Sequence, residues 1–147
     1  MPHPGQEIKR ANGFVLRIVA LDDDLLAMEA RYRGDAPLAQ SHHHPHQDEH
    51  FEVLEGTIHA VIGGVERWYG GGETFDVPAG TPHQMAAEGP TLVRWEVRPA
   101  LRTAEFFERF YHALDNGFPE GTTSDDFLAE YSDVFRLTAP EEPSSER

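Results

Sequence analysis

Residues 42–56, HHHPHQDEHFEVLEG, and residues 72–83, GETFDVPAGTPH, decide the fold of this chain. Five of its nine histidines lie in the first stretch, between positions 42 and 50. Each stretch also holds a short run of apolar residues that ends at glycine or proline, as short strands do. We therefore expect two strands here that carry histidine side chains toward an apolar interior.

Similar short runs lie on both sides of these stretches. The diglycine at 63–64 separates two of them and predicts a β-hairpin with a primed turn. Strands at this spacing, with glycine or proline at nearly every break, predict an all-β sandwich or barrel and argue against a βαβ unit. The strand of the second stretch covers residues 73–77, and the other predicted strands cover residues 14–20, 26–32, 57–62, 65–69 and 91–97.

The pattern becomes helical after Pro99. Aromatic residues recur every three or four positions from Phe106 to Tyr111, with Thr103 as the expected cap and Gly117 as the stop. A second stripe, residues 127–135, follows Ser124 as its expected cap. We interpret both stripes as packing surfaces and expect helix 103–116 on the outer sheet face or across a dimer. The predicted organisation is an N-terminal arm (1–13), a β-barrel domain (14–99), a helical extension (100–138) and a disordered tail (139–147).

Composition excludes several classes of protein. The 147 residues suit one domain, and the net charge of -14 argues against a nucleic-acid partner. Mean hydropathy is -0.53 and no apolar run reaches the ~18 residues of a membrane span, so no membrane partner is expected. The N-terminus lacks the apolar segment of an export signal, which predicts a cytoplasmic location. Without cysteine, any metal must be held by nitrogen and oxygen.

Strand parity selects the candidate metal ligands. In an extended segment His42 and His44 point to one face, because successive side chains alternate. On the next strand Glu49 shares a face with the apolar Phe51, and a buried carboxylate is costly unless it is paired or binds a cation. His83 follows a tight turn and brings a third imidazole from a neighbouring strand.

The predicted metal ligands are therefore His42, His44, Glu49 and His83. Three neutral nitrogens and one carboxylate suit a single divalent transition ion, with iron, manganese, nickel, copper and zinc left open, and suit calcium or magnesium poorly. The other histidines of the cluster are expected to face solvent or lie behind the ligands. These are His43, His46 and His50.

The two stretches resemble the two motifs of the cupin superfamily. In the first, His-x-His is followed after four residues by Glu, then after six more by Gly56. In the second, Gly72 precedes a Pro-Ala-Gly turn and His83. The second motif usually ends with an asparagine where this chain has Ala87. The resemblance implies a double-stranded β-helix, the small jelly-roll barrel, with a metal bound inside by the four residues already selected.

Two classes of function stay open. The first is a metal-dependent enzyme, a dioxygenase or an isomerase, that acts on a small organic molecule with Glu49 as general base. The second is a non-catalytic cupin that binds a sugar or a phenolic compound. Trp95 is expected in the apolar wall of the pocket. Small jelly-roll domains commonly pair, so the chain is expected to be a homodimer.

Overall fold

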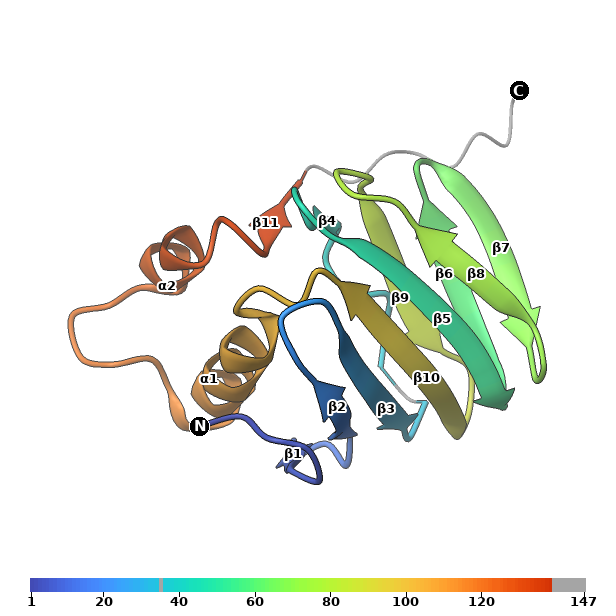
Figure 1. Cartoon of the computed structure of the whole chain (residues 1–147), viewed down its shortest axis with the longest axis horizontal. Helices are drawn as coiled ribbons and strands as arrows, with labels where there is room; N and C mark the ends of the chain where they lie inside the picture. The colour runs from blue at the N-terminus through green and yellow to red at the C-terminus, as the bar shows by residue number, and fades with distance from the viewer. Residues whose placement is uncertain (35, 139–147) are drawn as a thin grey trace.

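Two antiparallel β-sheets face each other in the computed structural model, which describes residues 1–34 and 36–138 (Figure 1). This arrangement is the double-stranded β-helix that the sequence predicts. The tail predicted to be disordered, 139–147, lies outside the described residues. The six-stranded sheet has the order β1 (Glu7–Lys9), β2 (Val15–Leu21), β3 (Leu26–Tyr32), β10 (Thr91–Arg98), β5 (Asp48–Glu55) and β8 (Thr74–Val77). The five-stranded sheet has the order β11 (Arg136–Leu137), β4 (His42–His43), β9 (His83–Ala87), β6 (Thr57–Ile62) and β7 (Val65–Gly70).

Alternation along the central strands builds the interior. In β10 every second residue, from Thr91 to Val97, is buried, while Arg94 and Arg98 are exposed. The register with β5 places Trp95 beside Phe51. One face of each strand is thus apolar because the side-chain period of two repeats without interruption.

Glycines allow the tight connections between these strands. Gly63 and Gly64 have φ values of 57° and 81°, as a primed hairpin turn between β6 and β7 requires. Gly56 has a φ of 88°, and a Cβ there would come within 2.5 Å of the Pro90 carbonyl oxygen. The glycine that ends the first motif is therefore required by both its conformation and its surroundings.

Two helices follow the barrel, α1 (Thr103–Asn116) and α2 (Ser124–Glu130). Gly117 ends α1 as predicted, but both cap predictions were wrong. Thr103 is already helical, and the cap residue Arg102 makes no side-chain cap bond. Thr123, not Ser124, caps α2 in a capping box with Asp126.

Both helices lie at one side of the barrel, α1 beside β1 and α2 farther out, next to β11 (Figure 1). The ring centroid of Phe107 is 5.1 Å from that of Trp95, whose side chain points inward from β10. The predicted position of α1 on the outer sheet face was therefore wrong. Its aromatic side covers the open end of the interior, because inward-facing rings there would otherwise contact water.

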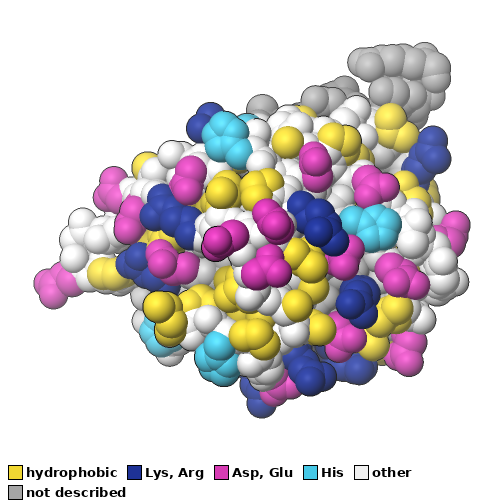
Figure 2. All heavy atoms as spheres, in the orientation of Figure 1, with side chains coloured by type: hydrophobic (Ala, Val, Ile, Leu, Met, Phe, Trp, Pro, Cys, Tyr) yellow, Lys and Arg dark blue, Asp and Glu magenta, His cyan; other side chains and the backbone are white. Residues whose placement is uncertain are grey.

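Charged side chains are mixed on the visible surface. Figure 2 shows acidic residues scattered among lysine and arginine over the six-stranded sheet. No continuous basic patch forms on that face among the described residues. Neither α1 nor α2 is long and apolar enough to span a membrane.

Candidate metal centre

The structure brings the four predicted ligands together inside the barrel. His42 on β4 lies directly opposite His83 on β9, and the ligand atoms of these two rings and of His44 are all within 4.8 Å of one another. Glu49 reaches the same point from β5. Its Oε1 is 3.2 Å from His44 Nε2 and 3.1 Å from His83 Nε2.

Each imidazole is oriented by a backbone carbonyl. The Nδ1 of His42 lies 2.8 Å from the Gln40 oxygen, and that of His83 lies 2.9 Å from the Thr81 oxygen. The Nδ1 of His44 lies 2.7 Å from the Val134 oxygen. A carbonyl only accepts, so all three Nδ1 atoms carry the hydrogen, and in the neutral rings each Nε2 keeps a free lone pair. This is the arrangement in which outer partners prepare histidines to bind a metal.

Trp95 fixes the carboxylate. Its Nε1–H donates to Glu49 Oε2 at 2.8 Å, and Glu49 is only 2% exposed. Oε1 is left as the oxygen that faces the imidazoles. Trp95 was predicted as pocket wall alone, and its hydrogen bond to Glu49 is a role that the sequence analysis missed.

Burial and charge act in opposite directions on these groups. Burial would raise the pKa of Glu49, but the neighbouring imidazoles of His44 and His83 outweigh burial and hold that pKa below its usual range. Burial would lower the pKa of His44, but the Glu49 charge raises it above its ordinary value. Burial, with the charges of His83 and His44, lowers the pKa of His42 to about 3, so this ring is neutral at pH 7.

Two buried atoms of the cluster show that a cation fits between them. His44 Nε2 and Glu49 Oε1 face each other, yet neither has a hydrogen-bond partner. With Nδ1 donating to Val134, a neutral His44 offers only a lone pair toward the carboxylate, which is also an acceptor. A positive charge between them removes this mismatch. Three imidazole nitrogens and one carboxylate oxygen suit a divalent transition ion.

The cluster forms the floor of a cavity of about 430 Å³. Its walls come from the barrel interior, the N-terminal arm and the aromatic side of α1. Polar groups are few above the floor, as in most small-molecule sites. The aromatic residues of α1, interpreted as packing surface, therefore also line the cavity.

The C-terminal strap, which we define as residues 134–138, closes one side of the centre. Phe135 stacks on the His42 ring at 4.7 Å with an interplanar angle of 21°. Residues 136–137 form β11, which pairs with His42 and His43 of β4. Residues 136–137 lie within the predicted helical extension 100–138, and a helical conformation is wrong for these two residues. A two-residue strand carries no periodic signal that could have revealed it.

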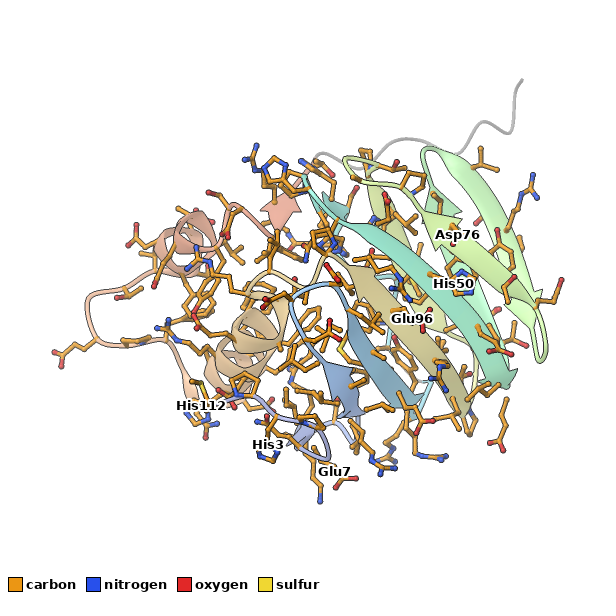
Figure 3. All side chains as sticks on the ribbon, viewed as in Figure 1. His3, Glu7, His50, Asp76, Glu96 and His112 are labelled. Carbon is orange, nitrogen blue, oxygen red and sulfur yellow. The ribbon has the colours of Figure 1, made fainter. Side chains whose placement is uncertain are left out.

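The remaining histidines lie away from the centre. Figure 3 shows His50 and Asp76 together on neighbouring strands, with Glu96 on the next strand. His50 Nδ1 is 2.7 Å from Asp76 Oδ1 at the exposed surface. His46 is exposed as well, and His43 is half-buried on the side of β4 away from the cluster.

A buried glutamine was also missed. Gln47 is 1% exposed, and its Nε2 donates to the carbonyl oxygens of Pro99 and Ala100 and to Thr103 Oγ1. It thus joins the loop between the ligands to the start of α1. Its position between the histidines and the acidic residues of the first motif could have indicated a structural role for Gln47, because this segment was already expected to lie at the metal site.

Comparisons with known proteins agree with this geometry. The sequence profile of the Cupin domain family matches residues 29–97. KdgF from Halomonas sp. has a TM-score of 0.57 and 27% identity, with 64% of this chain and 86% of that chain covered. An RmlC-like cupin from Shewanella frigidimarina has a TM-score of 0.60 and 19% identity, over 67% and 87% of the two chains. Streptomyces PAC13 with uridine has a TM-score of 0.54 and 14% identity, over 64% and 74%. No curated protein matches the sequence.

Proposed function

Because this chain belongs to the cupin superfamily, we propose that it is a metal-dependent enzyme that acts on a small organic molecule in the cavity. The observation that supports this function is the shared orientation of His42, His44 and His83. All three donate from Nδ1 to backbone and turn Nε2 toward one point beside Glu49. Purely structural histidines would have no reason to leave three lone pairs directed at a buried carboxylate.

The proposed ligands are His42, His44 and His83 through Nε2, and Glu49 through Oε1. A divalent transition ion at this place supplies Lewis-acid chemistry, as in an isomerase, or dioxygen chemistry, as in a dioxygenase, if the ion is redox-active. The aromatic walls exclude water, which strengthens every electrostatic interaction at the floor.

Glu49 is the proposed general base. Trp95 holds Oε2 in place, so Oε1, when it is partly released from the ion, is the atom that takes a proton from a molecule bound above the floor. The low pKa of this carboxyl keeps it ionised over the whole neutral range. General-base catalysis typically contributes about 10²- to 10⁴-fold in rate, and most when the pKa of the base lies near the operating pH.

A second function, binding without turnover, is favoured by one observation. Both oxygens of Glu49 are already committed, Oε2 to the hydrogen bond from Trp95 and Oε1, which lies 3.1–3.2 Å from two imidazole nitrogens, to the proposed ion. A carboxylate held this firmly is a good ligand and a poor proton carrier. The cavity would then serve a carrier or a sensor.

Elemental analysis and turnover together test the proposal. Protein purified without a nickel column should carry about one equivalent of a transition metal. Metal-loaded protein should then convert at least one member of a panel of small organic molecules, under air or without it. In Glu49→Gln the three imidazoles remain, so metal should still bind while turnover falls about 10²-fold or more.

The outcomes separate the two functions. Metal and ligand binding without any turnover supports the non-catalytic alternative. A wild-type protein that binds no transition metal contradicts both.

Pairing through an open sheet edge, at β1 or β7, is also proposed. Both strands have one neighbour only. Sedimentation should show a homodimer at micromolar concentration, and a species of 16.5 kDa alone would contradict it.

A further inference from the structure

One wall of the cavity is a continuous series of aromatic rings, which we call the aromatic ladder. It begins at Trp95, the partner of Glu49, and passes to Phe107 at 5.1 Å between ring centroids. Phe107 stacks on Tyr111 at 5.3 Å, and Tyr111 meets Phe14 at 5.6 Å. All four residues line the cavity, so a bound molecule contacts aromatic surface from the floor to the rim.

The rim has the opposite charge to the rest of the molecule. Acidic residues outnumber basic ones by 26 to 12, yet Glu49 at the floor is the single acidic residue among those that line the cavity. The charged residues of the rim are Arg10 and Arg33. Arg10 is paired with Asp115 at 3.2 Å. Arg33 is exposed and forms no ion pair within residues 1–34 and 36–138.

The walls discriminate against a sugar. A sugar carries a hydroxyl on most of its carbons, and each hydroxyl buried without a partner costs about tenfold in affinity. Away from the cluster and the two arginines, the polar side chains that line the cavity in the described residues are those of Asn12, Tyr32, Gln40 and Tyr111. The ladder itself offers the hydroxyl of Tyr111 alone. An aromatic ring instead gains from edge and face contacts with Phe107, Tyr111 and Phe14.

We propose that the cavity binds a small aromatic carboxylate. Its ring lies against the aromatic ladder, its carboxylate lies at the rim beside Arg33, and an oxygen substituent points toward the floor. This inference rests on the proposed function only for the floor end. Arg33 is a specificity-determining residue, because a guanidinium recognises a carboxylate through charge-assisted hydrogen bonds.

Three probes and three variants test this assignment, two at arginines and one, Tyr111→Leu, in the ladder. The probes are 4-hydroxyphenylacetate, its neutral amide 4-hydroxyphenylacetamide, and glucuronate as a sugar acid. Dissociation constants are measured by calorimetry on the metal-loaded full chain. The arginine variants are Arg33→Gln and the control Arg31→Gln, which removes the same charge from the exposed face of β3 outside the cavity lining.

We expect the aromatic acid to bind about tenfold tighter than its amide, and glucuronate at least tenfold weaker than the aromatic acid. Arg33→Gln should reduce the acid-to-amide ratio to about one, while Arg31→Gln leaves it unchanged. Tyr111→Leu should weaken acid and amide equally, since it removes ring contact and leaves the charge.

Several results overturn the inference. They are equal affinity for acid and amide, tighter binding of glucuronate, the same loss in both arginine variants, or no saturable binding of the acid at millimolar concentration. Metal content measured on the same samples keeps the two proposals apart. A protein that binds one equivalent of metal but shows no preference for the aromatic acid overturns this inference alone. A protein that prefers the aromatic acid but binds no metal overturns the proposed function alone.

Discussion

The barrel and the C-terminal strap contribute to the same centre in different ways. The barrel supplies the four candidate ligands from β4, β5, β9 and the residue after β4. The strap supplies no ligand, but its Val134 carbonyl orients His44 and its Phe135 ring covers His42. The chemical identity of the centre is therefore a property of the strands, and its geometry depends also on a segment 90 residues away.

The two regions are also held in place differently. The ligand strands are hydrogen-bonded to their neighbours along the sheets. The strap pairs with β4 through two residues only and is otherwise held by ring contact between Phe135 and Phe106 at 5.0 Å, and Asp133, just before the strap, forms an ion pair with Arg102. Four changes to the chain test whether ligation and orientation can be separated.

The largest effect is expected from removing two ligands. His42→Ala combined with His44→Ala should abolish stoichiometric metal, because two of the four donors are lost. Elemental analysis measures it. His43→Ala with His46→Ala is the matched control and should keep a full equivalent. If the variant without His42 and His44 still binds one equivalent of metal, the metal site lies elsewhere.

The second largest effect is expected on stability, from a substitution in α2 at a residue that contacts none of the candidate metal ligands. Phe127 is 3% exposed and contacts the rings of Phe106 and Tyr131, but no member of the cluster. Phe127→Ala should lower the free energy of unfolding by about 3–5 kcal/mol, measured by urea denaturation of the metal-free protein. The metal affinity of the folded variant should stay within about twofold of wild type. Loss of a residue that orients a metal ligand would instead lower the affinity about tenfold or more. A parallel loss of affinity would mean that the whole extension, and not the strap, sets the geometry.

A smaller effect is expected from the strap itself. Phe135→Ala removes the ring stacked on His42 and should weaken metal binding about tenfold. Val134→Ala is the control, since it cuts a buried side chain but keeps the carbonyl that accepts from His44. Competition titration with a chelator measures both. Equal weakening in the two variants would show that the strap acts only through stability.

The smallest effect belongs to the ion pair that anchors the strap. The hydrogen bond and charge of Arg102 outweigh partial burial and lower the pKa of Asp133 from 3.8. A lowered folded-state pKa stabilises the protein above pH 3.8 and loses that contribution as the pH falls through the folded value. Both side chains are well exposed, so Asp133→Asn should cost less than about 1 kcal/mol at pH 7. The difference in melting temperature between Asp133→Asn and wild type should become smaller as the pH falls. A difference that becomes larger in acid would contradict the lowered pKa of Asp133.

Much of the fold was predictable from local pattern. The strand at 26–32 and the hairpin around Gly63 and Gly64 agree with the structure because alternation and turn residues act over a few positions. Strand β1 was missed, since three residues of the N-terminal arm are too few to show a period. The cap of α2 was displaced by one residue because Thr123 and Ser124 are both good caps and only the bond to Asp126 distinguishes them.

The sequence by itself determined which residues gather at the centre. Strand parity turns His42, His44 and Glu49 inward, and parity depends only on neighbouring residues. The tertiary structure alone decided how these residues are held. The hydrogen bond from Trp95 to Glu49 spans 46 positions, the bond from His44 to Val134 spans 90, and α1 packs over the open end of the barrel interior. Such contacts join residues that no local period relates, so they exist only once the sheets, the helices and the strap have packed together.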